Sequence, residues 1–523
     1  MHAEDAYLFR HALLRDAAYQ LQTPGDRAKL HELALDVLEM LFDGPPPGPV
    51  TDRWGDRYCE SHPIDTIALE LSTHAHMALS RQEACSEGLP AREALYVRRA
   101  AEWAESTYRH DDAARLWERL SELVDEKELA EVLTRAADPS KSSGDRTRQE
   151  ELLRRALECA TSTGDRHAEG VAHRWLALVF DDMAQPALAE KSLEQAIQIF
   201  REIDNRKQLG KALSNMAGMY GESGKIDVAE RLYEEAIAEQ RQLGNRKSEG
   251  IALGNLAILY KNTGRIDLAE RTQQLALEIH REVGNRRSEG ISLGNLGLLY
   301  SQSGRPDAAE SALRSALTIH REVGNRTTEG QLLTNLGALY HTTGRLELAE
   351  TTLQRGLSIL RDTGFRRGEG TALGLLGVLY TTMGQFQRAD QCYSDAIAIH
   401  RSCGDLRKEG IELGNKACLL RNAGQFEIAD RVFVDALDIH RKTGNRRHLG
   451  AHLCAHAVCL LALGRHDEAS DAWDEGVSLL HQLRDSGQLR IVTKSMREAC
   501  AKADIEPFDV PGEDEAAPPP SAE

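Results

Sequence analysis

The chain has 523 residues, of which 41% are hydrophobic, 28% are charged and 5% are aromatic. This composition excludes a disordered or fibrous chain, and no apolar run reaches the roughly 20 residues that a membrane-spanning helix needs. The formal charge of −18 disfavours binding to nucleic acid or to an anionic membrane. The nine cysteines are scattered and form no C-x-x-C motif, so we expect reduced thiols in a cytoplasmic protein.

Residues 1–44 contain two helical patterns, YLFRHALLRDAAYQ and LHELALDVLEML. The segment is similar to the helical part that follows the nucleotide-binding and winged-helix parts of bacterial STAND signalling ATPases, where an arm of tetratricopeptide repeats (TPR) comes next. This resemblance implies a sensor or scaffold arm of a bacterial signalling system, with the ATPase lost or carried on another chain. It depends on Phe9, Arg10, His11, Leu14, Tyr19, Leu30 and His31.

Two further segments precede the regular part of the chain. Residues 45–63 begin with PPPGPV and are expected to be a Pro-rich linker. Residues 64–163 are expected to form degenerate helical hairpins, one of them over 91–124, where Ala101 and Ala113 keep the spacing of small residues seen in later repeats. Residues 145–163 are predicted to be the second helix of another hairpin.

A period of forty residues governs 164–483. One glycine series runs from Gly170 to Gly450 and a second from Gly224 to Gly464, and tyrosine recurs from Tyr220 to Tyr380. Self-similarity at a fixed period is typical of repeat proteins, in which each unit buries its apolar side against its neighbours. The sequence therefore predicts eight stacked units.

Each unit has the pattern of a helical hairpin. Apolar residues of the first helix fall on one face, and a turn glycine follows. The D-x-x-E spacing of Asp307 and Glu310 predicts a capping box at the start of the second helix, as do Asp227 with Glu230 and Asp267 with Glu270. Gly324 is expected to end the second helix in the left-handed conformation. The predicted caps of the following first helices are Asp165, Asn245, Asn285, Asn325 and Asp405.

The unit resembles the tetratricopeptide repeat, in the forty-residue form of kinesin light chain and of Pins-type adaptors. The resemblance implies an all-α, right-handed superhelical solenoid with a concave binding face. A capping helix is expected over 484–505 and a disordered acidic, Pro-rich tail over 506–523. The matching residues are Leu293, Leu296, Gly297, Tyr300, Gly304, Ala309, Leu313 and Ala316.

An asparagine recurs in the first helices, and in similar families the matching residue points into the groove and bonds the backbone of an extended peptide. An amide suits this role because it offers both a donor and an acceptor. The alternative is that these amides bond between adjacent repeats and bind nothing. Leu375 interrupts the series, which consists of Asn215, Asn255, Asn295, Asn335 and Asn415.

Other periodic residues border the same groove. Ile258, Leu298, Ala338 and Val378 are expected to give it apolar walls. Glycine at 254, 294, 374 and 414 costs about 1 kcal/mol in a helix relative to alanine. This cost suggests a close approach of another backbone, either between helices or by a ligand.

Two charged or titratable series run along the ends of the second helices. His280, His320, His400 and His440 are interpreted as structural, because equivalent residues of neighbouring hairpins lie roughly 8–10 Å apart, too far for one metal ion. Partial positive charge there would suit the helix dipole. Arginine recurs from Arg241 to Arg441, and glutamate follows eight residues later from Glu249 to Glu409. These are predicted to pair as a solvated stabilising edge, or to form a docking stripe for acidic partners.

Catalytic motifs are missing from the sequence. GESGKI at 221–226 lacks the first glycine and the final Ser or Thr of a phosphate-binding loop, and HELAL at 31–35 lacks the second histidine of a zinc-protease motif. We therefore expect a protein that is not an enzyme and needs no cofactor or metal.

The predicted function is a scaffold or sensor arm that binds a protein or peptide segment in the groove, in bacterial signal transduction. A separate ATPase or kinase chain is a further expected partner, and nucleic acid and membranes are not. The alternative is a small-effector-sensing module of a STAND-type ATPase. The scarcity of tryptophan in the eight units, with only Trp175 before Trp473, favours a peptide over a sugar.

Overall fold

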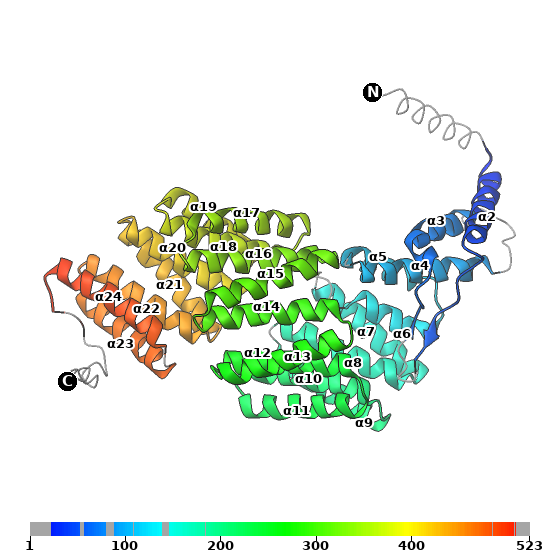
Figure 1. Ribbon diagram of the computed structural model, residues 1–523, viewed down its shortest axis with the longest axis horizontal. Helices are drawn as coiled ribbons and strands as arrows, with labels where there is room; N and C mark the ends of the chain where they lie inside the picture. The colour runs from blue at the N-terminus through cyan, green and yellow to red at the C-terminus, as the bar shows by residue number, and fades with distance from the viewer. Residues whose placement is uncertain are drawn as a thin grey trace. The chain divides into compact units, whose positions relative to one another are not determined.

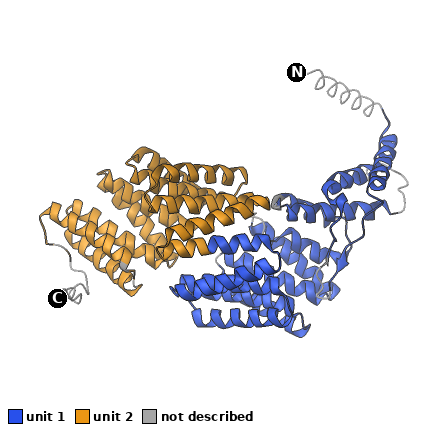
Figure 2. Cartoon of the chain, in the orientation of Figure 1, with its two compact units in different colours: residues 1–295 blue, residues 296–523 orange. Residues whose placement is uncertain are grey.

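The computed structural model describes residues 22–52, 57–79, 88–107, 109–138, 146–183, 185–483, 485–506 and 508. Five residues of the STAND resemblance, Phe9, Arg10, His11, Leu14 and Tyr19, lie outside this part, as does almost all of the predicted tail. The contacts divide the chain into two compact units, residues 1–295 and 296–523 (Figure 2).

The first unit begins with helices that do not follow the forty-residue repeat (Figure 1). Leu35, Ile64, Leu71 and Tyr96 form a small core between them. The elements are α2 (Pro24–Leu41), β1 (Val50–Thr51), β2 (Arg57–Tyr58), the 3-10 helix η1 (Pro63–Ile67), α3 (Ala68–Leu79), α4 (Leu89–Ser106), α5 (His110–Leu120), α6 (Glu126–Ala136) and α7 (Arg146–Thr163). Strands β1 and β2 pair antiparallel. The hairpin expected over 91–124 is confirmed as α4 and α5, and the helix expected over 145–163 as α7.

Sixteen helices of seventeen residues follow, as the forty-residue period predicts. The first helices of the hairpins are α8 (Arg166–Asp182), α10 (Arg206–Glu222), α12 (Arg246–Asn262), α14 (Arg286–Gln302), α16 (Arg326–Thr342), α18 (Arg366–Thr382), α20 (Leu406–Asn422) and α22 (Arg446–Ala462). The second helices are α9 (Pro186–Glu202), α11 (Ile226–Gln242), α13 (Ile266–Glu282), α15 (Pro306–Glu322), α17 (Leu346–Asp362), α19 (Phe386–Ser402), α21 (Phe426–Lys442) and α23 (His466–Gln482). The all-α repeat solenoid is therefore confirmed.

The chain after the last hairpin forms α24 (Ser486–Ala503), which packs against α22 and α23. Val492, Met496 and Cys500 of α24 join Trp473 in one apolar cluster. In the described part of the chain, no helix is both long and apolar enough to cross a membrane.

The predicted turns between hairpins are confirmed. Gly324 has a φ of 71°, the left-handed conformation that a side chain resists. Asn325 Oδ1 then accepts the backbone N–H of Thr328 at 3.2 Å and caps α16. The same cap is made by Asp165, Asn245, Asn285 and Asp405.

The predicted capping boxes of the second helices are wrong. Helix α11 starts at Ile226, so Asp227 lies inside its first turn, and the cap residue Lys225 makes no side-chain cap bond. Glu230 instead joins neighbouring hairpins: it accepts Tyr260 Oη at 2.8 Å and Arg265 Nη1 at 2.8 Å. Glu310 makes the same contacts with Tyr340 and Arg345. Glu230 and Glu310 thus join successive hairpins.

The predicted pairing of the arginine and glutamate series is confirmed, but the glutamates are buried and do not form a solvated edge. Arg321 Nε donates to Glu329 Oε1 at 2.8 Å across the turn, and Arg326 Nη1 donates to Oε2 at 2.6 Å. Burial alone would raise the pKa of Glu329, but the bonds from the two arginines lower it below its ordinary value. Equivalent pairs join Arg241 to Glu249, Arg281 to Glu289, Arg361 to Glu369 and Arg401 to Glu409.

Candidate functional site

The first helices of neighbouring hairpins touch one another and so form a continuous wall within each unit. In the second unit α16 contacts α18, α18 contacts α20 and α20 contacts α22, and in the first unit α8 contacts α10 and α10 contacts α12. We call this surface the first-helix wall. Its side chains follow a spacing of i, i+4 and i+7, which places them on one face of each helix.

The asparagine series lies on the first-helix wall. Asn215, Asn255, Asn295, Asn335 and Asn415 are all half-buried, so each side chain is partly open to solvent. In two of these helices the residue four positions before the asparagine is more exposed than the asparagine itself. These residues are Ile251 and Ile291, which are 44% and 43% exposed. The four residues that were predicted to give the groove its apolar lining are half-buried on the same face: Ile258, Leu298, Ala338 and Val378.

The asparagine amides differ in their hydrogen bonds. Among the described residues, the side chains of Asn255 and Asn335 have no hydrogen-bond partner, and Asn215 Nδ2 is buried without one. Asn415 is the exception, because its Nδ2 donates to Glu412 Oε2 at 3.2 Å. The amides of Asn255 and Asn335 thus keep both a donor and an acceptor available.

A cavity of about 420 Å³ opens on the wall in the second unit, beside Asn335. Three successive first helices line it: α16 through Gln331 and Asn335, α18 through Arg367, and α20 through Lys408. Within the described residues neither Arg367 nor Lys408 makes a salt bridge. The cavity therefore combines an amide with two cationic side chains and with one carboxylate, that of Asp405.

Two residues that line the cavity depart from the repeat pattern. Phe365 stands where other units have a capping Asn or Asp, and its ring lies against Gly368, so closely that a Cβ on that glycine would overlap it. No other unit has glycine at this position, where the residues are Ala168, Gln208, Ser248, Ser288, Thr328, Lys408 and His448. The spacing of residues in the sequence did not predict this cavity. In the sequence alone, Phe365 and Gly368 indicate only that this unit lacks a capping residue.

The structure shows which groups come close to the helical glycines of the wall. The carboxyl of Glu412, from α20, fills the space beside Gly374, and the imidazole of His452, from α22, fills the space beside Gly414. Gly254 has only Gln273 Nε2 near, at 3.9 Å from an added Cβ. At 374 and 414 the approach is therefore between helices.

Buried titratable groups gather at this contact. Burial raises the pKa of Glu412 to about 7. His440 Nε2 lies 3.0 Å from His452 Nδ1, and the ring of His448 lies 6.1 Å from that of His452. Burial, with the repulsion of neighbouring cations, lowers the pKa of His448 to about 4 and that of His452 to about 3. Over the described ranges, no group of three or more His, Cys, Asp or Glu side chains is arranged to hold a metal ion.

The histidine series is buried and packs against glycines. His280, His320, His400 and His440 are at most 2% exposed. Burial lowers the pKa of His280 and His400, and that of His440 to about 4. The charged form of His280, His400 and His440 is therefore disfavoured, which corrects the expectation that these side chains carry partial positive charge at the helix ends.

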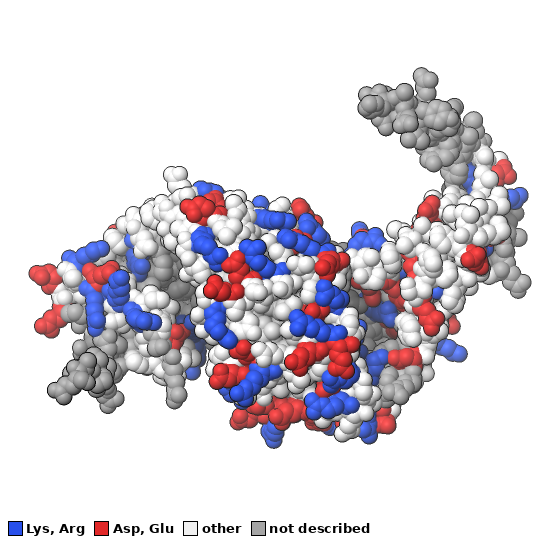
Figure 3. All heavy atoms as spheres, viewed as in Figure 1, with Lys and Arg blue, Asp and Glu red and all other residues white. Residues whose placement is uncertain are grey.

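Charged side chains of both signs are interspersed over the face drawn in Figure 3. The net charge of −18 is thus not gathered there into one acidic field.

Several solved structures are similar to this chain. BtubC (BKLC) from P. vanneervenii has 23% identity and a TM-score of 0.37, covering 41% of this chain and 91% of its own. A Rap protein complexed with competence and sporulation factor has 14% identity and a TM-score of 0.46, covering 68% and 99%. A STAND protein with a tetratricopeptide repeat sensor from Pyrococcus horikoshii has 14% identity and a TM-score of 0.46, covering 92% and 67%. No curated protein matches the chain.

Family models of the tetratricopeptide repeat match more than half of the sequence. One matches residues 170–242, 208–281, 248–322 and 328–402, and two others match 413–449 and 450–475. All of these matches begin and end within the eight forty-residue hairpins. The chain belongs to the tetratricopeptide repeat proteins.

Proposed function

We propose that the first-helix wall binds an extended segment of a partner protein. The observation that carries the proposal is that an amide is available at the same position of the wall in each unit, Asn255 in the first and Asn335 in the second. A peptide unit presents one N–H and one C=O, and an amide satisfies both without demanding a particular side chain. Half-buried apolar neighbours such as Ile258 and Ala338 would cover the peptide's side chains.

The cations of the cavity favour a segment with acidic residues at one end. Arg367 and Lys408 come from adjacent first helices and have no carboxylate within ion-pair distance among the described residues. A carboxylate of the partner placed between them would gain charge-assisted hydrogen bonds. The role we propose is that of a non-catalytic scaffold or sensor arm in bacterial signalling, acting in the cytoplasm, with a separate ATPase or kinase chain as a further partner.

The test compares two variants of the full chain. Asn255→Ala/Asn295→Ala/Asn335→Ala removes three amides from the wall, and Gln274→Ala/Gln391→Ala removes two amides from second helices, where both glutamines are exposed. Proteins captured from lysate of the source cell are identified by mass spectrometry. A synthetic peptide from the captured protein is then titrated by fluorescence anisotropy.

The proposal expects wild type and the glutamine variant to bind the peptide alike. The asparagine variant should bind at least about ten-fold more weakly, because two or three neutral hydrogen bonds contribute about 1 kcal/mol each. Circular dichroism should show the same helicity for all three proteins. Equal binding by the asparagine variant would overturn the proposal.

The alternative is a small effector held in the cavity beside Asn335. Its volume of about 420 Å³ falls within the range of ligand pockets, and this observation favours the alternative. Arg367→Gln distinguishes the two. It should abolish the response to a small effector, but it should weaken only in part the binding of a peptide that also contacts Asn335 and Ala338 of the same unit.

A further inference from the structure

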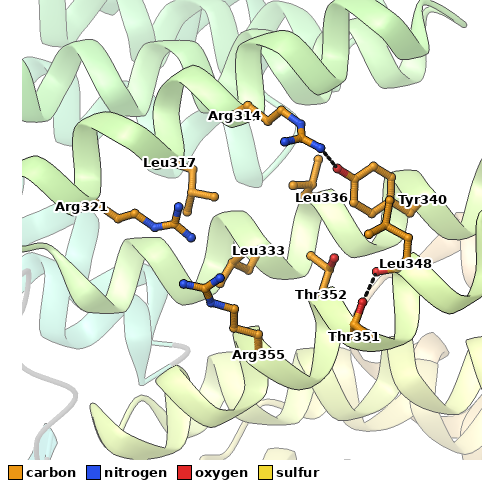
Figure 4. Close-up of a pocket in the computed structure, with 10 residues that line it drawn as sticks. All are labelled: Arg314, Leu317, Arg321, Leu333, Leu336, Tyr340, Leu348, Thr351, Thr352 and Arg355. Carbon is orange, nitrogen blue, oxygen red and sulfur yellow. Dashed lines mark hydrogen bonds between the residues drawn. The ribbon is translucent and has the colours of Figure 1, made fainter.

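A second hollow lies on the opposite side of α16 from the asparagine face, between the second helices α15 and α17. Its volume is about 300 Å³, and Figure 4 shows the residues that line it. Leu317, Leu333 and Leu336 are buried beneath it and form an apolar floor. Arg314, Arg321 and Arg355 surround this floor, and no acidic residue lines it. We call it the arginine furrow.

Two of these arginines replace a salt bridge that other hairpins make. Arg201 Nη2 contacts Glu235 Oε1 at 2.9 Å in the first unit, and Arg441 Nη2 contacts Glu475 Oε2 at 2.9 Å in the second. Each pair joins one second helix to the next. At the equivalent positions of the arginine furrow stand Arg321 and Arg355, which reach from α15 and α17 toward one another (Figure 4). A pair of opposite charges is thus replaced by two positive charges.

The repeat itself shows how unusual these side chains are. Within the eight forty-residue units Arg355 is the only basic residue at its position, since the other seven have Gln195, Glu235, Leu275, Ser315, Asp395, Asp435 and Glu475. Arg314 is likewise the only basic residue at its own position, where the others have Glu194, Glu234, Gln274, Gln354, Ser394, Val434 and Asp474. Both substitutions fall on the same furrow, in a chain whose net charge is −18.

The surrounding carboxylates do not balance this charge. Glu329 is shared by Arg321, Arg326 and, at 4.0 Å, Arg355. Glu310 is shared by Arg314 and Arg345. Five guanidinium groups thus surround two carboxylates. Arg314 Nη2 also donates to Tyr340 Oη at 2.9 Å, which holds it beside the floor.

We propose that the arginine furrow binds a small organic anion, a phosphate or carboxylate joined to an apolar group. The anion would lie between Arg321 and Arg355, where planar guanidinium groups offer paired donors, and the apolar group would cover the leucine floor. The site is separate from the first-helix wall, and the proposal does not depend on peptide binding there.

The test uses hexyl phosphate, inorganic phosphate and hexyltrimethylammonium as probes in calorimetric titrations of the full chain. Arg355→Glu is the informative variant, because it recreates the cross-helix pair that Arg441 and Glu475 make and should therefore fold normally. Arg431→Gln is the matched control, since Arg431 is an exposed arginine on α21, outside the furrow. Arg367→Gln controls for binding in the cavity beside Asn335.

Hexyl phosphate should bind wild type, Arg431→Gln and Arg367→Gln alike, and at least about ten-fold more weakly to Arg355→Glu, which loses one charge-assisted contact and gains a repulsive carboxylate. Hydrogen exchange of the segments 314–321 and 351–355 should slow when the probe binds. The proposal is overturned if wild type fails to bind hexyl phosphate, if Arg355→Glu binds it equally, or if hexyltrimethylammonium binds as well.

Discussion

The imidazole of His400 fills the space where Gly370 lacks a side chain: a Cβ on that glycine would lie 2.8 Å from His400 Cε1 and Nε2. The residue thirty positions after each glycine of this series belongs to the paired second helix. His280 packs in this way against Gly250, and His440 against Gly410. Where no histidine is present, Phe200, Gln240 or Leu360 takes its place. The glycine and histidine series are therefore two sides of one packing contact.

Replacing Gly370 with alanine should destabilise the fold. The added methyl group would overlap a buried ring with no room to move, and overpacking of this kind costs about 1–3 kcal/mol. Gly254→Ala is the control, because its Cβ would meet nothing nearer than 3.9 Å, and it should stabilise helix α12 by about 0.5–1 kcal/mol. Thermal unfolding followed by circular dichroism measures both. The packing account fails if the two variants shift the midpoint in the same direction.

Replacing Glu329 with glutamine should destabilise the turn between α15 and α16. The change removes the buried carboxylate that the partly exposed Arg321 and Arg326 share, which we expect to cost about 1–3 kcal/mol. Because the folded-state pKa of Glu329 is lowered, its contribution is present above the ordinary pKa and is lost as the pH falls through the folded-state value.

The control for Glu329 is Asp438→Asn. Asp438 pairs with Lys442 on the surface, with side chains that are 57% and 67% exposed, so its loss should change stability by less than about 0.5 kcal/mol. Denaturant midpoints at pH 7 compare the two variants. Equal effects would show that the buried turn contact is no stronger than a surface pair.

The histidine cluster of α21 and α22 should make the fold sensitive to acid. The pKa of His440 and of His448 is lowered to about 4 and that of His452 to about 3, so the folded chain keeps them neutral while the unfolded chain binds protons below its ordinary value near 6.5. The free energy of unfolding should therefore fall as the pH drops from about 6.5 toward 4, by up to about 1.4 kcal/mol per pH unit and site.

Two variants check the sign of this dependence. His452→Gln removes one titrating site and should flatten the loss of thermal stability between pH 7 and pH 5. Glu412→Gln should steepen it, because the raised pKa of Glu412, about 7, makes the folded chain bind a proton that the unfolded chain releases in this range. Identical pH profiles for wild type and both variants would contradict the assignment.

The repeat architecture could be predicted from the sequence because its signals are local and recur eight times. Gly324 and Asn325 specify a turn by conformation and capping, which need no knowledge of the rest of the chain. The pairing of Arg321 with Glu329 could likewise be predicted, since the turn brings residues eight apart together.

Contacts between hairpins could not be predicted in the same way. Glu230 was expected to cap its own helix, but its partners Tyr260 and Arg265 come from the next hairpin, thirty and thirty-five residues later. The burial of His400 depends on a glycine of a paired helix, which the helix dipole argument ignores. The cavity beside Asn335 is lined by Phe365 and Gly368, two departures from the pattern, together with residues of three first helices, and the sequence does not show that these residues come together.

Site-specific photo-crosslinking tests the central claim, that the first-helix wall binds a partner segment, most directly. Benzoylphenylalanine placed at Leu375, half-buried on the wall beside Thr371, is compared with the same group at Val434, which is 54% exposed on a second helix. The account predicts that position 375 crosslinks one contiguous partner segment in lysate of the source cell, that Asn255→Ala/Asn295→Ala/Asn335→Ala abolishes the crosslink, and that position 434 gives none. Equal crosslinking at 434, or an unchanged crosslink in the asparagine variant, would contradict it.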